Sequence, residues 1–134
     1  MIAVDTNVIS VLCIAGPLSP YAGACFRRDP VWAAPRLWRY EFLNVLATSV
    51  RLGSIDTRAA ESAWHAALLR LASHEQQPDP LRTLTVATTH QITAYDAQFV
   101  VVAQSLGLPL LTEDKELRKK FPGLAVSLKT FAAS

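Results

Sequence analysis

Charged residues are scarce in this sequence, and the few charges nearly balance. Asp, Glu, Lys and Arg make up 18% of its 134 residues, and the formal net charge is +2. So small a charge does not by itself indicate nucleic-acid binding. Because 51% of the residues are hydrophobic, extended disorder is excluded and a buried core is expected. The length predicts one domain over residues 1–134.

Cysteines and long hydrophobic runs are also few. Cys13 and Cys25 match no zinc-binding spacing and are too few for a disulfide scaffold, so we expect buried, reduced thiols. No run approaches the roughly 20 apolar residues that cross a bilayer. The first residues, MIAVDTN, lack the basic and apolar regions of a signal peptide. We therefore predict no membrane association and a cytoplasmic location.

Short apolar runs alternate with stretches of helical periodicity, which predicts an α/β fold with a parallel sheet covered on both faces. Pro35 stands where proline favours a first helical turn. The polar residues 75–80 include two prolines and predict a loop between helices. We expect strands at 2–4, 31–34, 109–112 and 124–128, and helices at 6–14, 18–28, 35–52, 57–73, 79–90, 95–106 and 114–120.

Four acidic residues, called the four acids below, are expected near one edge of this sheet. Sites in such sheets form beyond the carboxyl ends of the strands, and two of the acids follow strands directly. Crowded carboxylates cannot all stay ionised without a counter-charge, and their hard oxygens suit Mg²⁺ or Mn²⁺. Such an ion can lower the pKa of a bound water and clamp a phosphodiester. The four acids are Asp5, Glu41, Asp96 and Asp114.

Each acid also has a structural alternative. Asp5, Asp96 and Asp114 are all placed to cap a helix, a role that stabilises by about 1 kcal/mol. Glu41 lies too far inside its helix to be a cap, and a carboxylate beside an apolar face costs several kcal/mol unless it is paired. Its alternatives are an ion pair with Arg39 or a solvated edge of the helix.

Four short motifs follow one another along nearly the whole chain: Asp5-Thr6-Asn7, Tyr-Glu-Phe-Leu-Asn-Val-Leu at 40–46, Tyr-Asp-Ala-Gln-Phe-Val at 95–100 and Leu-Thr-Glu-Asp at 111–114. Together and in this order they resemble the PIN-domain family. The resemblance is strongest to the VapC toxins of bacterial toxin–antitoxin pairs. It implies a PIN-like three-layer sandwich, with a small parallel sheet flanked by helices, and a metal-dependent endoribonuclease.

The resemblance also implies roles for individual residues. In that family the positions of the four acids hold Mg²⁺ or Mn²⁺ and activate water for RNA cleavage, with Asp5, Asp96 and Asp114 as the metal ligands. A small antitoxin protein and a homodimer are the implied partners. Positions that hydrogen-bond the acids or the metal-bound water match Thr6, Asn7 and Thr112.

Basic residues near the four acids are candidates for binding RNA phosphates. Arg39 lies close to Glu41, and Lys115 follows Asp114 at the start of a basic group that continues with residues 118–120. The alternative for this group is an ordinary solvated helix face.

Other functions remain as alternatives. A haloacid-dehalogenase-like phosphatase would need a second Asp two residues after Asp5, where Asn7 stands. A receiver domain would carry its phosphoacceptor Asp after a middle strand. The non-enzymatic alternative is a catalytically inactive PIN-like module that binds RNA or protein, although such a module has no electrostatic reason to keep four acids.

Overall fold

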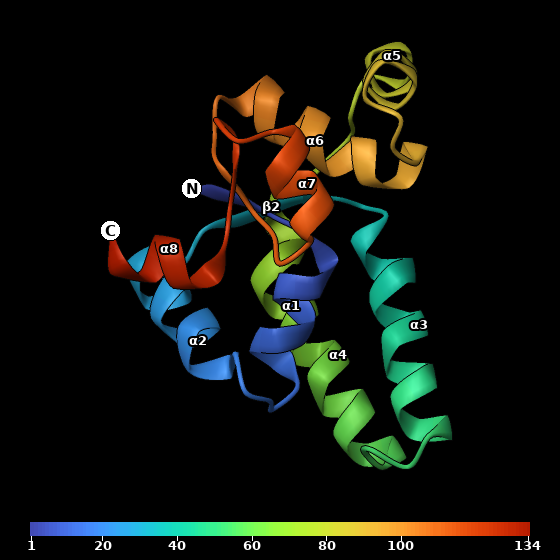
Figure 1. The fold of residues 1–134 in the computed structure, drawn as a ribbon. Coiled ribbons are helices and arrows are strands. Elements are labelled where there is room, and N and C mark those ends of the chain that lie inside the picture. The colour runs from blue at the N-terminus through green and yellow to red at the C-terminus, as the bar shows by residue number, and fades with distance from the viewer.

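A five-stranded parallel sheet runs through the centre of the structure, a computed structural model that describes residues 1–134 (Figure 1). Its strand order is β3-β2-β1-β4-β5, and every neighbouring pair is parallel. The first strand of the chain is therefore the central one, and all five carboxyl ends meet at one edge. The strands are β1 (Ile2–Val4), β2 (Trp32–Pro35), β3 (Glu75–Gln76), β4 (Leu110–Leu111) and β5 (Ala125–Val126).

Helices cover both faces of the sheet. α6 packs across β1, β2 and β4, and α4 packs on β2 and α1 from the other side (Figure 1). The predicted α/β sandwich is thereby confirmed. The helices are α1 (Thr6–Cys13), α2 (Ser19–Arg28), α3 (Trp38–Arg51), α4 (Thr57–Leu71), the 3-10 turn η1 (Ala72–His74), α5 (Pro80–His90), α6 (Ala94–Leu106), α7 (Lys115–Lys120) and α8 (Leu128–Ala133).

The core lies on both faces of the central strands. Ile2 and Val4 on β1 are fully buried, as expected for a strand that helices cover from both sides. Trp32 and Trp38 are also fully buried and belong to the core. Both cysteines are free, but only Cys25 is fully buried.

The segment around Pro35 departs from the prediction. Pro35 ends β2 rather than opening a helix, and it lies opposite Gln76 of β3. Residues 75–76, predicted as loop, therefore form a short strand instead. Proline lacks a backbone donor, so the end of a strand accommodates it well. Glu75 and Gln76 are both polar, so this strand lacks the alternation of apolar and polar residues by which a strand is recognised. For this reason the sequence did not predict it.

The C-terminal segment also differs from expectation. The predicted strand 124–128 is shortened to β5, and Leu128 begins the unpredicted helix α8, which packs on α2. Ser127 caps this helix by accepting a hydrogen bond from the Thr130 amide at 3.1 Å. One short helical run offers too few turns for its periodicity to be detected. None of the helices is both long and apolar enough to span a membrane.

Candidate functional site

Asp5 lies at the carboxyl end of the central strand, where its side chain is only 6% exposed. It is the N-cap of α1, because its Oδ1 accepts a hydrogen bond from the Thr6 amide at 2.8 Å. The capping alternative is therefore confirmed for Asp5. This role engages only one carboxylate oxygen, and Oδ2 has different partners.

The second oxygen of Asp5 meets two of the predicted supporting residues. Thr112, fully buried at the end of β4, donates its hydroxyl to Asp5 Oδ2 at 2.8 Å and accepts from the Asp114 amide at 3.0 Å. The Asn7 amide group donates to Asp5 Oδ2 at 3.3 Å and to the Thr112 hydroxyl at 3.4 Å. These contacts join the ends of two neighbouring strands and hold the Asp5 carboxylate in one orientation.

Glu41 reaches the same place from α3. Its Oε1 accepts the Thr6 hydroxyl at 2.6 Å, so the third predicted supporting residue also contacts an acid. The expected alternative partner, Arg39, instead makes a two-point ion pair with Glu75, with Nε–Oε2 at 2.6 Å and Nη2–Oε1 at 2.7 Å. The predicted alternative of an ion pair between Glu41 and Arg39 is therefore wrong. Nothing local in the sequence indicated Glu75, because it lies 36 positions from Arg39.

Asp96 and Asp114 occupy two different helix starts. Thr93, not Asp96, is the N-cap of α6, and its hydroxyl accepts from the Asp96 amide at 3.0 Å. The capping alternative is wrong for Asp96. Asp114 does cap α7, since its Oδ1 accepts from the amides of Glu116 at 2.8 Å and Leu117 at 3.1 Å.

The electrostatics show that the four acids act on one another. Burial raises the pKa of Asp5 to about 6, with smaller contributions in the same direction from the charges of Asp96 and Glu41. Burial and the charge of Asp96 raise the pKa of Glu41. Burial and the charge of Asp114 raise the pKa of Asp96. Asp96 is thus the common neighbour that links the other three carboxylates.

The donor set suits a divalent cation, but its present spacing does not enclose one. No three His, Cys, Asp or Glu side chains lie close enough together to hold a metal ion in this structure. The oxygens are nevertheless the ligands that Mg²⁺ and Mn²⁺ prefer. Burial is the main cause of the raised pKa values of three of the acids, and their mutual negative charge, which a cation would neutralise, adds to it. Ligation would require the carboxylates to move toward one another.

The two predicted RNA-binding residues lie in different settings. Lys115 is exposed at the first position of α7, directly after Asp114. The Arg39 guanidinium is occupied by Glu75, whose pKa this ion pair lowers. Arg118, from the same basic group as Lys115, donates to the Thr112 carbonyl at 3.0 Å and so brings a positive charge close to the acids.

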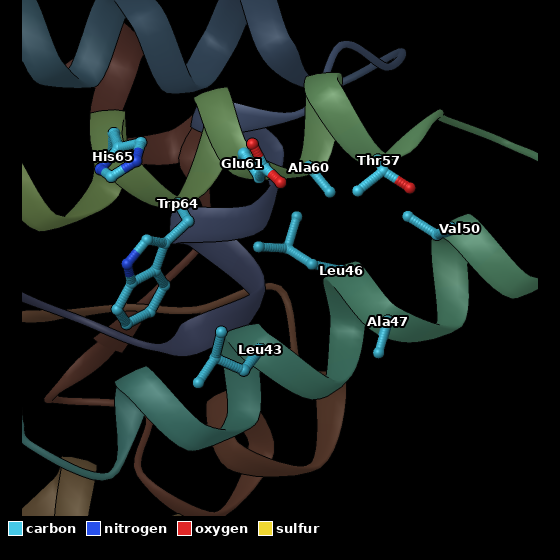
Figure 2. A pocket seen from close by; sticks show the side chains of 9 residues that line it. All are labelled: Leu43, Leu46, Ala47, Val50, Thr57, Ala60, Glu61, Trp64 and His65. Atoms are coloured by element: carbon cyan, nitrogen blue, oxygen red, sulfur yellow. The ribbon is translucent and has the colours of Figure 1, made fainter.

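A large apolar cavity lies elsewhere, between α3 and α4 (Figure 2). Its volume is about 490 Å³, and none of the four acids lines it. Figure 2 shows Leu46 and Trp64 projecting between the two helices. Trp64 also stacks on the buried Trp38, with ring centroids 5.5 Å apart. Apart from Thr57, Glu61 and His65, its lining is apolar, so this groove holds no cluster of catalytic groups.

Comparisons with known proteins agree with this fold. Residues 2–120 match the model of the PIN domain family. Exonuclease VapC9 of Pyrobaculum aerophilum is 37% identical over 91 residues, which cover 68% of this chain and 67% of that protein. Ribonuclease VapC3 of the same organism is 28% identical over 92% of this chain and 96% of its own length. Ribonuclease VapC1 of Mycobacterium tuberculosis is 29% identical over 76% of each chain.

Two solved structures share the architecture. The crystal structure of PAE2754 from Pyrobaculum aerophilum is 30% identical and superposes with a TM-score of 0.79, covering 98% of this chain and 92% of that one. A toxin–antitoxin complex from Klebsiella pneumoniae has a chain that is 17% identical, with a TM-score of 0.66 over 96% of this chain and 98% of that one. The second likeness supports the fold alone.

Proposed function

The chain belongs to the PIN domain family, and we propose that it is a Mg²⁺- or Mn²⁺-dependent endoribonuclease, the toxin of a toxin–antitoxin pair. The observation that carries this proposal is the convergence of the four acids at the carboxyl edge of the sheet, where burial and neighbouring charges raise the pKa of three of them. Similarity to proteins named as VapC ribonucleases supports RNA as the substrate.

The residues would divide the work as follows. Asp5, Asp96 and Asp114 would hold the cation. Asp114 uses only Oδ1 for its cap, whereas both oxygens of Asp5 already accept hydrogen bonds and would bind the cation through their remaining lone pairs. Glu41, anchored through Oε1 by the Thr6 hydroxyl, would accept a proton from the attacking water at Oε2, which has no hydrogen-bond partner in the protein. When bound, the cation supplies a lowered pKa for that water and neutralises charge on the phosphodiester.

Thr112 and Asn7 would act by positioning rather than by chemistry. Their hydrogen bonds to Asp5 Oδ2 restrict the carboxylate to one orientation before any ligand arrives. Groups that orient a metal ligand typically affect metal affinity or activity by 10- to 100-fold. Lys115 would contact RNA phosphates from its exposed position beside Asp114. Arg39 could contribute only if RNA displaces Glu75 from its guanidinium.

Partners and location complete the proposal. An antitoxin that presents a basic side chain to the four acids would inhibit by replacing the cation. A homodimer is supported by Leu81 and Leu84 on one face of α5, which are 74% and 57% exposed and which a second copy would remove from water. The free cysteines are compatible with the reducing cytoplasm, where we place the protein.

The test is cleavage of a quenched fluorescent RNA by the purified chain with Mg²⁺, Mn²⁺ or EDTA. We expect cleavage with either ion and none in EDTA. Asp96→Asn should abolish it, while Asp56→Asn, a matched change at the cap of α4, should not. Undiminished cleavage in EDTA would contradict the metal dependence. RNA binding without cleavage at any metal concentration would favour the alternative of an inactive binding module.

A further inference from the structure

A polar cavity at the carboxyl ends of β2 and β3 has no role in the chemistry described above. Its volume is about 440 Å³, within the range of ligand pockets. Its lining comes from β3, from the residues that follow β2 and β3, and from Gln98 of α6. Apart from Leu37 and Pro78, the side chains that line it are Arg36, Glu75, Gln76, Gln77 and Gln98.

The fold places this cavity next to the acids. Arg36 and Gln77 follow the carboxyl ends of β2 and β3, as Asp5 follows β1 in the same parallel sheet. Neighbouring strands lie about 4.8 Å apart, so the end of β3 lies about 10 Å from that of β1. The helix α3 also connects the two places, because Leu37, which lines the cavity, lies one turn before Glu41.

The cavity extends along the molecule rather than ending blindly. A second cavity of about 300 Å³ shares Gln77, Pro78 and Gln98 with it. This second cavity is also lined by Ala94, the first residue of α6 and two residues before Asp96. The shared wall joins the two cavities into one groove along the start of α6, polar near the ends of β2 and β3 and mainly apolar beyond them. An elongated groove of this kind suits an extended strand.

The charges and hydrogen bonds of the lining suit a nucleotide. Glu75 is neutralised by its two-point ion pair with Arg39, whereas Arg36 makes no ion pair and leaves the cavity with a free positive charge. The side-chain amides of Gln77 and Gln98 make no hydrogen bond within the protein, and Gln76 uses only its Nε2, toward the His74 carbonyl at 3.2 Å. Each free amide offers a donor and an acceptor side by side.

We propose that this cavity binds one unpaired base of the RNA substrate next to the scissile phosphate, with Gln77 and Gln98 reading the base edge and Arg36 binding its phosphate. Single-stranded RNA is recognised through such contacts to splayed bases, and paired amide hydrogen bonds discriminate among them. This inference rests on the proposed ribonuclease function and identifies where its sequence preference arises.

The test uses Gln variants that keep side-chain length but lose the amide hydrogen bonds, and an Arg variant that loses the charge. Gln77→Met and Gln98→Met are paired with Gln104→Met on α6, whose amide oxygen accepts from Arg82 outside the cavity. Arg36→Gln is paired with Arg58→Gln on α4. Short RNA oligonucleotides that differ only in the bases flanking the cleaved bond give kcat and KM for each variant. Thermal melting confirms that each variant folds, and fluorescence anisotropy in EDTA measures binding without cleavage.

We expect Gln77→Met or Gln98→Met to raise KM about tenfold for the preferred base, to leave kcat nearly unchanged and to flatten the base preference. Arg36→Gln should weaken binding to all oligonucleotides and lower the slope of log K against log salt by about one. If the wild-type chain cleaves RNA and both Gln variants keep its base preference, the base-binding role of the cavity is wrong. The proposed ribonuclease function is then unaffected.

The remaining outcomes separate the inference from the function on which it rests. If the wild-type chain binds RNA without cutting it, the proposed function fails. Whether the cavity binds a base is then decided by whether the Gln variants lose the base preference of binding. If it neither binds nor cuts RNA, both fail. Variants that weaken only the complex with the antitoxin would overturn the RNA assignment in favour of a protein ligand.

Discussion

The edge of the sheet that carries the four acids and the apolar cavity between α3 and α4, called the groove here, both use residues of α3. The two regions have opposite character. Near the start of α3, Glu41 joins a group of half-buried carboxylates whose charges oppose one another. Further along, Leu46 is 4% exposed and packs among apolar side chains (Figure 2). The first region contains unfavourable electrostatics, and the second adds buried apolar area. One helix can therefore carry the charge that function requires, because its remaining turns are anchored by packing.

The largest effect should separate activity from stability at the acid edge. We expect Asp5→Asn to lower RNA cleavage by more than about 100-fold, since losing a ligand should exceed the effect of losing a group that merely orients one. Asn still caps α1 about as well as Asp, and one charge of a self-repelling group is gone. The melting temperature without metal should therefore hold or rise. Full activity in Asp5→Asn would contradict the site.

The groove should respond in the opposite way. Leu46→Ala removes a buried side chain and should lower the free energy of unfolding by about 2–5 kcal/mol, while the folded fraction cleaves RNA at the normal rate. Leu43→Ala is the matched control, because Leu43 lines the same groove but is 44% exposed, and its loss should stay under about 1.5 kcal/mol. Urea unfolding measures both. A specific loss of activity in folded Leu46→Ala would show that the groove contributes to cleavage and not only to stability.

The two regions should also differ in their response to pH. Burial raises the pKa of Asp5 from 3.8 to about 6, so the folded state favours the protonated form. The stability from this group is fully present below pH 4 and is lost as pH rises through 6, by at most about 3 kcal/mol. The raised pKa values of Glu41 and Asp96 act in the same direction.

This pH dependence is measured by unfolding the metal-free chain at intervals between pH 4 and 7. Asp5→Asn should flatten the profile in that window, whereas Leu46→Ala should lower the whole curve without changing its shape. An unchanged slope in Asp5→Asn would show that Asp5 is ionised at no cost to the fold.

The smallest effect tests the positioning residues. Thr112→Val removes the hydroxyl that donates to Asp5 and should lower cleavage about tenfold. It should also raise the pKa of Asp5 further, because that hydrogen bond lowers it. The control is Thr88→Val on α5, whose hydroxyl donates to the Leu84 carbonyl at 3.0 Å and contacts none of the four acids. Equal losses of activity in the two variants would indicate that Thr112 has only a structural role.

The sequence predicted those parts of the molecule that depend on local pattern or strand ends. Asp5 and Asp114 follow apolar strands, and Thr112 ends one, so parallel pairing alone brings them to a common edge. The separation of Arg39 from Glu41 could not be predicted. It depends on Glu75, which β3 carries into reach only because two polar residues pair with the end of β2. Contacts between segments that are distant in the sequence cannot be predicted from the local periodicity of apolar residues.

The pairing of β1 with β4 has a consequence for the order of events during synthesis. Ala3 of β1 pairs with Leu110 of β4. More than a hundred further residues must therefore be synthesised after β1 before it can pair with β4. Asp114, the last of the four acids to be made, depends on the same late segment. Contacts of such long sequence separation are slow to form. A ribosome-bound chain that lacks β4 therefore carries an incomplete set of carboxylates. The proposed RNA cleavage would be delayed until synthesis of the protein is nearly complete.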